Sequence, residues 1–403
     1  MIRAKYNKIA YCVVAHLVDT GHIVEYFREH AHDFFLFIHP PSFKNQETVF
    51  RHYQYGLLVS EEKMFAYKGN SKVLIYVFIF LYYWRFLCRF KLRRTHIVVT
   101  HPIFLLFHSV QRMAWQNRLV LWLWDYFPSS SRLLRFYNWI LDGYVKHVDH
   151  VIFLTDAIGC KYDSLRNDDQ SRTISFGLAK RDVLRAPVKN HLGFIGIIKE
   201  GQGLDMMLEL VAHDPNLKLD VVGDGPVRGK LVKAAEERGV SERITFFGYQ
   251  HDDSVLRISA GWLAGLALYE ESIVTNISFA DPSKVKLYLE LGVPVIMTNV
   301  TYLADSIGRE HAGVCVGASV SEILRAVEQI SRNYSLYQEG IAKLVERLEF
   351  GSKYDHDFQF LQTDACSSRF CHTIRSIGAT PGKYRNNQGI RYSYPYAFTM
   401  SNP

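Results

Sequence analysis

The stretch HLGFIGIIKEGQGLDMMLELVA, His191–Ala212, decides the fold that we predict for this chain. An apolar strand runs into a glycine loop that carries a lysine, and a segment of helical period follows. Two later stretches repeat the order of strand, tight turn and helix: LDVVGDGP (Leu219–Pro226) and DPSKVKLYLELGVPVIMT (Asp281–Thr298). A helix that begins beside a glycine turn presents unpaired backbone N–H groups, and a nearby lysine adds a full positive charge. Two such corners in one domain predict a diphosphate ligand.

Taken together, the three stretches resemble the donor-binding domain of a known enzyme family. Their order and spacing are similar to those of nucleotide-sugar-dependent glycosyltransferases of the GT-B fold, especially the retaining family-4 (group 1) enzymes of bacterial polysaccharide and lipid synthesis. The resemblance is good from about His191 to Gly317 and weaker over Ile9–Gly177. It implies an α/β protein with two doubly wound Rossmann-like domains that face a cleft.

The rhythm of the whole chain agrees with two such domains, because short apolar runs alternate with segments of helical period in both halves. The polar stretch Gly177–Asn190 separates the two series and is the expected hinge. Ser319 and Glu322 form a capping-box pattern that predicts another helix start. The predicted parts are an acceptor-side domain in 1–185, a nucleotide-sugar-binding domain in 186–335, a helix in 336–362 that the resemblance expects to cross back to the first domain, and an irregular tail in 365–403.

The predicted strands are short apolar runs that end in polar or Gly/Pro turns. Those of the first half are Ile9–Ala15, Phe34–His39, Ile97–Thr100, Leu119–Leu123, Val151–Leu154 and Thr173–Phe176. Those of the second half are His191–Ile195, Lys218–Val222, Ile244–Phe247, Ala264–Leu268, Val293–Met297 and Val314–Val316.

Composition narrows the classes of partner and cofactor. The 403 residues carry a formal net charge of +7, which suits anionic partners such as a nucleotide diphosphate or an anionic lipid. Nucleic acid is the least favoured of these, because no zinc-finger spacing, RNA-binding aromatic signature or long basic block occurs. The six cysteines are scattered without a CxxC, so we expect reduced thiols and no metal. The run Ile9–Ala15 reads as a first strand rather than a signal peptide.

The segment Val73–Arg94 raises the question of membrane contact. Its apolar run ends at Arg85 after about a dozen residues, short of the roughly 20 that span a bilayer. Its aromatic and basic end suits a lipid headgroup layer. A buried helix with a solvated basic end explains the pattern equally well. We therefore expect a cytoplasmic protein, with peripheral contact at the inner face of the plasma membrane as an open alternative.

Lys199 and Lys284 are the predicted diphosphate clamp. A cation and a helix N-terminus can act on the same phosphate oxygens as negative charge builds on the leaving group. Gly196 and Gly203 bound the loop that carries Lys199, and Pro282 and Ser283 precede Lys284. The family resemblance expects an arginine directly after the loop glycine, where this chain has isoleucine. Either lysine could instead be a solvated surface residue, and Lys199 is the weaker candidate.

The nucleoside end of the donor is less clearly encoded. The resembling family carries two glutamates separated by seven residues, and the second binds the ribose; in this chain its position is Leu287. Glu270, Glu271 and Glu290 do not reproduce the motif's spacing. Gly248 and Tyr249 match the place where the family seats the base against the backbone. The identity of the nucleotide therefore stays open.

Predicted acceptor-side residues follow strands of the first half, because doubly wound sheets bind ligands at the carboxyl ends of their strands. His16, Asp19 and Gly21 follow the first strand, and His101 and Asp125 follow later ones. Asp125 and His101 could bind the sugar or an acceptor hydroxyl. His101 precedes a proline, so it could instead only cap a turn.

The resemblance implies a glycosyltransferase that moves a sugar from a nucleotide-diphosphate donor to a glycan or lipid-linked acceptor in surface polysaccharide synthesis. It further implies retention of configuration, with the donor phosphate helping to deprotonate the acceptor and with no cofactor or metal. Two alternatives stay open. One is a nucleotide-sugar epimerase of the same fold. The other is a non-catalytic partner protein that has lost the arginine and the glutamate.

Overall fold

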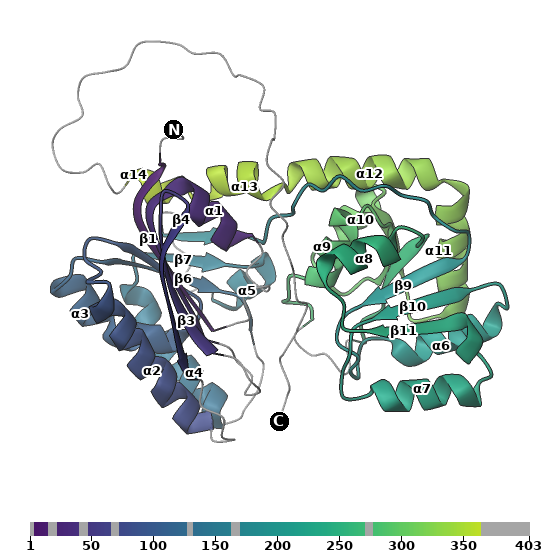
Figure 1. The fold of residues 1–403 in the computed structure, drawn as a ribbon, viewed down its shortest axis with the longest axis horizontal. Helices are drawn as coiled ribbons and strands as arrows, with labels where there is room; N and C mark the ends of the chain where they lie inside the picture. Colours follow the sequence, from purple (N-terminus) through teal and green to yellow (C-terminus); the bar gives the residue numbers. More distant parts are fainter. Residues whose placement is uncertain are drawn as a thin grey trace, which may run out of the picture.

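The computed structural model describes residues 4–14, 22–39, 47–65, 72–126, 132–162, 170–270 and 277–363. Within these ranges the chain forms two α/β domains, each built on a separate sheet with helices packed against it (Figure 1). Every strand pairing of the second sheet is parallel, as are most pairings of the first. The predicted fold class is therefore confirmed.

The N-terminal sheet has eight strands in the order β4-β3-β2-β1-β5-β6-β7-β8. Strand β1 pairs with β2 on one side and with β5 on the other, so the order of strands reverses at this point. The strands are β1 (Tyr6–Val14), β2 (Ala31–His39), β3 (Glu47–Gln54), β4 (Leu57–Phe65), β5 (His96–Val99), β6 (Arg118–Leu123), β7 (His150–Phe153) and β8 (Ser171–Thr173).

Two features of this sheet differ from the sequence prediction. The hairpin of β3 and β4 was missed, because its turn is Tyr55–Gly56 rather than Asn-Gly, although both turn residues have the positive φ of a type I′ turn (48° and 82°). The strand predicted over Thr173–Phe176 is wrong, since β8 ends at Thr173. The backbone N–H of Phe176 instead donates to Asp281 of the second domain (2.9 Å).

Helices cover both faces of the N-terminal sheet, with α2, α3 and α4 on one side and α1 near the C-terminal helices on the other (Figure 1). The core between them is rich in aromatic side chains. The helical segments are α1 (Ile23–His30), α2 (Lys72–Arg89), η2 (Pro102–Phe107), α3 (His108–Met113), α4 (Arg132–Tyr144), η3 (Val145–His147) and α5 (Asp156–Lys161).

The C-terminal sheet has six strands in the order β11-β10-β9-β12-β13-β14, all parallel. The first strand of the domain, β9, lies in the middle, and the strand order reverses between β9 and β12. Open α/β sheets bind ligands at such a switch point, beyond the carboxyl ends of the strands. The strands are β9 (His191–Ile195), β10 (Lys218–Val222), β11 (Ile244–Gly248), β12 (Ala264–Ala267), β13 (Val295–Thr298) and β14 (Gly313–Val316).

The helices of the C-terminal domain begin close to the predicted places. The capping-box helix begins at Val320, but its caps differ from the prediction: the carboxylate of Glu322 accepts from the backbone N–H of Gly317, and the Ser319 side chain forms no capping bond. The helical segments are α6 (Leu204–His213), α7 (Arg228–Glu237), η5 (Ser241–Arg243), α8 (Asp252–Ser259), α9 (Ser283–Glu290), α10 (Ala304–Arg309) and α11 (Val320–Arg332).

Three last helices, α12 (Tyr334–Arg347), α13 (Phe350–Asp357) and α14 (Phe360–Thr363), run from the C-terminal domain back to the N-terminal one (Figure 1). Tyr354 and Phe358 are fully buried in the N-terminal core. The interdomain linker passes alongside, and the N–H of Leu178 donates to the carbonyl of Leu348 (2.8 Å). The linker is thus anchored by backbone pairing at this point. The predicted tail, 365–403, lies outside the described residues.

Candidate functional site

The candidate site lies at the switch point of the C-terminal sheet, where two glycine turns meet. Gly196 (φ 146°) follows β9 and Gly223 (φ 131°) follows β10. A Cβ atom on Gly223 would lie 1.9 Å from the carbonyl oxygen of Gly196, so no side chain fits between the two turns. Gly203, which has a φ of 70°, is the N-cap residue of α6. These glycines carry no side chain, so a ligand can approach the backbone closely at this corner.

Lys284 projects into this corner from the second position of α9, but it is buried rather than solvated. Only 6% of the residue is exposed. Its ammonium donates to the side-chain oxygen of Gln202 and lies 4.2 Å and 5.1 Å from the ring centres of Phe194 and Tyr269. It also lies next to Gly196. Burial, with a smaller contribution from the charge of Lys199, lowers the pKa of Lys284 to about 7.

Lys199 lies on the same side of the corner, close enough to contribute to the pKa shift of Lys284. Its side chain is half-buried, and burial lowers its own pKa. The N-terminus of α9 completes the corner: Pro282 is its N-cap residue and forms no side-chain cap. The hydroxyl of Ser283 is buried and has no hydrogen-bond partner among the described residues. Two cations and a helix N-terminus that lacks a side-chain cap therefore converge where an anion would bind.

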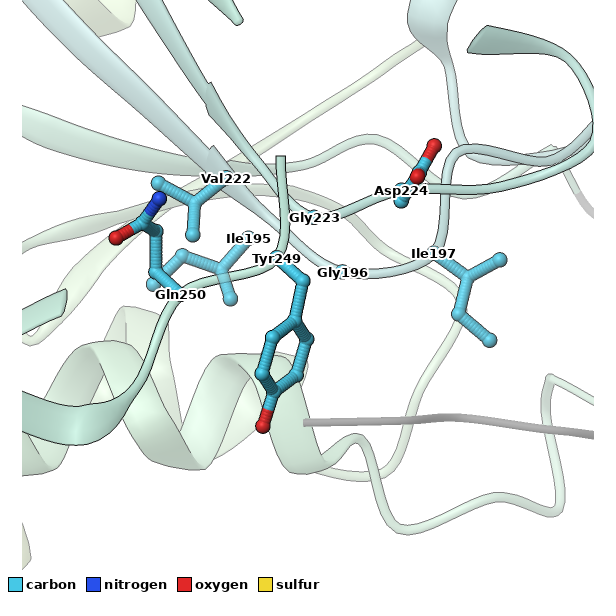
Figure 2. Close-up of a pocket in the computed structure, with 8 residues that line it drawn as sticks. All are labelled: Ile195, Gly196, Ile197, Val222, Gly223, Asp224, Tyr249 and Gln250. Atoms are coloured by element: carbon cyan, nitrogen blue, oxygen red, sulfur yellow. The ribbon is translucent and has the colours of Figure 1, made fainter. Parts of the chain in front are cut away.

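A hollow next to the corner continues along the carboxyl ends of β9, β10 and β11 (Figure 2). Its volume is about 330 Å³, including the open space at its mouth. Figure 2 shows the turns at Gly196 and Gly223 beside each other, with the ring of Tyr249 projecting from the adjoining loop. The lining residues are Ile195, Gly196, Ile197, Val222, Gly223, Asp224, Tyr249 and Gln250. Tyr249 thus lines the hollow as a base-binding residue would, whereas Gly248, which has a φ of 65°, ends β11 at its edge.

His101 lies at the carboxyl end of β5 in the N-terminal domain, between the rings of Tyr76 and Tyr137 (5.4 Å and 5.3 Å between ring centres). Its Nδ1 accepts from the backbone N–H of Ile103 (3.2 Å), which is a turn cap of the kind considered above. Burial, aided by His39, lowers the pKa of His101 to about 3, so the ring is neutral. With Nδ1 accepting, the proton is on Nε2, and His101 can donate to a ligand but cannot act as a charged acid.

Asp125 follows β6 on the same edge of the N-terminal sheet. Burial raises its pKa to about 6. Burial also raises the pKa of neighbouring Tyr137, with smaller contributions from Tyr162 and Asp125. The next residue, Tyr126, packs on Phe279 of the C-terminal domain (4.9 Å between ring centres). Phe279 lies three residues before Pro282. The structure therefore brings the Asp125 loop and the segment before α9 together between the two domains.

The remaining predicted residues fall into two groups. Gly21, His16, Asp19 and Glu271 lie outside the described residues. Glu290 is buried, but it joins the domains rather than binding a ligand: it accepts from the N–H of Ala179 (2.9 Å), from Arg181 (3.0 Å) and from His22 (3.0 Å between Oε1 and Nε2). Burial raises its pKa, but the hydrogen bond from His22 and the other partners outweigh burial and hold the pKa below its usual value.

Sequence reasoning missed Gln202, the partner of Lys284, because a glutamine between two loop glycines gives no pattern that pairs it with a residue 82 positions away. Glu270 was noted only for its spacing, yet its carboxylate accepts from the N–H of Gly203 (3.1 Å) and so fixes the start of α6. Leu287, in the place of the family's ribose-binding glutamate, is a core residue with 3% exposure. Within the described ranges no group of three or more His, Cys, Asp or Glu residues could hold a metal ion.

Comparison with known proteins agrees with this fold. Residues 210–354 match the family described as glucosyltransferase 3-like, C-terminal domain. A search of curated proteins gave no match. Among solved structures, the sucrose-phosphate synthase of Thermosynechococcus elongatus is similar over 90% of this chain and 100% of its own, with a TM-score of 0.67 and 13% identity.

Two further structures share the architecture. Alr3699/HepE of Anabaena in complex with UDP is similar over 88% of this chain and 100% of its own, with a TM-score of 0.61 and 13% identity. The catalytic domain of starch synthase IV from Arabidopsis thaliana, bound to ADP and acarbose, is similar over 90% of this chain and 99% of its own, with a TM-score of 0.62 and 9% identity. Residues 210–354 thus match a glycosyltransferase domain family, and the chain has the two-domain GT-B fold of these glycosyltransferase structures.

Proposed function

We propose that the C-terminal domain binds a nucleoside diphosphate sugar and that the sugar is transferred to a glycan or lipid-linked acceptor held against the N-terminal domain. The observation that carries this proposal is the corner formed by Gly196, Gly223, Lys199, Lys284 and the N-terminus of α9. Among the described residues Lys284 has no carboxylate partner, and a buried cation without one costs folding free energy. Its place beside two glycine turns therefore favours an anionic ligand.

The proposed chemistry follows from the charge of the leaving group. When the bond between the anomeric carbon and the diphosphate oxygen breaks, negative charge builds on that oxygen. The ammonium of Lys284 and the N–H groups at the start of α9 stabilise this charge. Binding of the diphosphate raises the pKa of Lys284, so that the side chain is fully charged when it is needed.

We assign the acceptor side to His101 and Asp125. His101 donates from Nε2 to a sugar or acceptor oxygen, and Asp125 orients an acceptor hydroxyl. Transfer with retention, in which the donor phosphate takes the acceptor proton on the same face, is the stereochemistry that the resemblance to the retaining family-4 enzymes supports. The proposal needs no cofactor besides the donor, and surface polysaccharide synthesis is its proposed setting.

The test uses the purified chain. Calorimetry with UDP, ADP and GDP measures whether the corner binds a nucleoside diphosphate, and mass spectrometry with nucleotide sugars and a lipid extract detects transfer. We expect micromolar binding of one nucleotide and a product heavier than the acceptor by one sugar. Failure of every nucleotide to bind would reject the site. Conversion of the donor sugar without an acceptor would identify an epimerase instead.

A non-catalytic partner protein stays the second candidate, and a specific observation favours it. Leu287 occupies the ribose-binding position of the family and is buried in the core, so the carboxylate that holds the donor is missing there. Nucleotide binding without turnover for any donor would support this candidate. The Lys284 corner weighs against it, because a decayed site has no reason to keep a desolvated cation.

We also propose a peripheral contact with the inner face of the plasma membrane, since a lipid-linked acceptor would be presented there. None of the described helices is long and apolar enough to cross a membrane.

A further inference from the structure

Helix α2 has an outer face that is apolar and partly exposed to solvent. Its inner face packs into the core through Ile79, Tyr83 and Phe86. An ordinary surface helix would place polar residues on the opposite face. Here the first three turns of that face instead expose four large apolar side chains between 38% and 54%: Leu74, Val77, Leu81 and Trp84.

The spacing of these four residues places them on one stripe along the helix, because steps of three and four residues return to the same face. Neighbouring helices add to the apolar surface. Phe136 and Trp139 of α4 are 44% and 64% exposed and stack on each other (5.9 Å between ring centres). Figure 1 shows α2 and α4 on the same side of the N-terminal sheet.

The stripe runs into a basic cluster at the C-terminal end of α2. The side chains of Arg85 and Arg89 are 57% and 56% exposed and share the carboxylate of Glu62 (2.6 Å and 3.7 Å). Two arginines on one carboxylate leave a positive charge uncompensated. Three more exposed basic residues follow directly: Lys91, Arg93 and Arg94. We call the stripe and this cluster the α2 surface.

The α2 surface is connected to the acceptor side of the candidate site. Tyr76 belongs to the first turns of α2 and packs on His101, and Tyr137 of α4 packs on the other side of the same ring. The helices that carry the exposed side chains of Val77 and Phe136 thus also contact His101. The basic cluster lies at the far end of the helix.

We propose that the α2 surface docks onto an anionic lipid bilayer, with the stripe inserted into the headgroup region and the basic cluster paired with lipid phosphates. This inference deepens the proposed membrane contact and identifies the acceptor class as lipid-linked. It does not depend on sugar transfer, because the α2 surface shares no residue with the donor corner.

A bilayer fits the chemistry of the α2 surface better than a folded partner or a second copy does. Apolar side chains beside a dense cluster of basic residues match the acyl boundary and the phosphates of one leaflet at the same time. A second copy would place the two basic clusters or the two apolar stripes against each other. A dimer formed in this way would thus leave the positive charge of at least one basic cluster without an anionic partner.

The test is co-sedimentation of the purified chain with vesicles. We expect binding to phosphatidylcholine vesicles that contain anionic phosphatidylglycerol, weaker binding to pure phosphatidylcholine, and release at 1 M salt, where screening acts within about 3 Å. Arg93→Ser with Arg94→Ser should lower the partition coefficient about 30-fold, because each basic residue near an anionic surface contributes about fivefold. Leu74→Ser with Leu81→Ser should also weaken binding, because it removes apolar area that the stripe would insert into the headgroup region.

Matched controls change the same residue types elsewhere. Lys230→Ser with Lys233→Ser removes two exposed charges from α7, and Leu184→Ser removes a leucine of the linker that is 94% exposed. Both controls should bind vesicles normally, and all variants should bind nucleotide like the parent chain. Equal loss in a control, equal binding to neutral vesicles, or no binding to any vesicle would overturn the inference. So would self-association that disappears in the Leu74 and Leu81 variant, because it would identify a second copy as the occupant.

Discussion

The two sheets end in the same kind of edge, yet the side chains at these edges differ in charge. At the C-terminal sheet, two glycine turns lie against each other, and Lys199 and Lys284 supply positive charge. At the N-terminal sheet, aromatic rings surround a neutral His101, and burial favours the uncharged form of Asp125. One fold thus places a cationic corner, our proposed diphosphate site, on one side of the domain boundary and a weakly polar, aromatic surface, our proposed acceptor side, on the other.

The strongest way to break this comparison is to remove the cation from the C-terminal edge. Lys284→Met should lower sugar transfer by about 100-fold to 1000-fold, since a group that stabilises a leaving oxyanion contributes about 3 to 4 kcal/mol. Steady-state kinetics measures the loss. Lys230→Met, on the exposed side of α7, should leave the rate unchanged. Near-normal turnover in the Lys284 variant would show that the diphosphate binds elsewhere.

The corresponding change on the N-terminal edge should act on stability. Between pH 3.8 and about 6 the folded protein holds the proton of Asp125 that the unfolded chain releases, so the stability contributed by this group falls as pH rises. Asparagine does not ionise, so Asp125→Asn avoids the stability that is lost when the buried carboxyl group becomes charged. The variant should raise the free energy of unfolding at pH 7 by about 1 to 3 kcal/mol. Urea unfolding at pH 4 and pH 7 measures the difference. Asp142 is an exposed residue of α4, so Asp142→Asn should give no pH-dependent gain in the free energy of unfolding.

The pH dependence of donor binding sharpens the comparison further. Because the pKa of Lys284 is about 7 without ligand, the fraction of charged lysine falls above neutral pH. Affinity for UDP should therefore fall about 15-fold between pH 7 and pH 8.5, and binding should take up a proton. Calorimetry in buffers of different ionisation enthalpy measures both quantities. The Lys284→Met variant should lose this dependence.

The same shift makes a prediction for the unliganded protein. Between about pH 7 and 10.5 the unfolded chain holds a proton on Lys284 that the folded protein has released. The stability contributed by this group should therefore rise with pH over this window, and the full cost of burying the charge should be present below pH 7. The free energy of unfolding of the parent chain and of Lys284→Met is measured across this window. If the difference between the two does not change with pH, the lowered pKa assigned to Lys284 is wrong.

The smallest effect on sugar transfer is expected when Lys199 is replaced. Its side chain is only half-buried, and it acts beside Lys284 rather than alone. Lys199→Ala should lower transfer about tenfold, in the lower range for a charged hydrogen-bond partner. The ratio of the transfer rates of the Lys199 and Lys284 variants measures how much each lysine contributes to catalysis. A Lys199 effect larger than that of Lys284 would reverse the assigned roles.

The C-terminal domain was the more predictable half, because its signals are local. Each strand, glycine turn and helix start is encoded within about ten residues, and the three corners repeat one pattern. The hairpin of β3 and β4 was missed because its turn places Tyr55 at a positive φ of 48°, which few non-glycine residues adopt. The start of α11 was predicted correctly, but its capping hydrogen bonds were not. The carboxylate of Glu322 accepts from the backbone N–H of Gly317 instead of forming the capping box with Ser319.

The sequence by itself determined the two-sheet α/β class, the glycine turns and the presence of lysines beside them, since these depend on periodicity and on which residues tolerate positive φ. Only the tertiary structure decided that Lys284 is buried against Phe194 and Gln202 rather than solvated, and hence that its pKa lies near 7. It also decided that the apolar outer face of α2 is partly exposed to solvent. Burial depends on which distant segments pack together, and no local pattern records that.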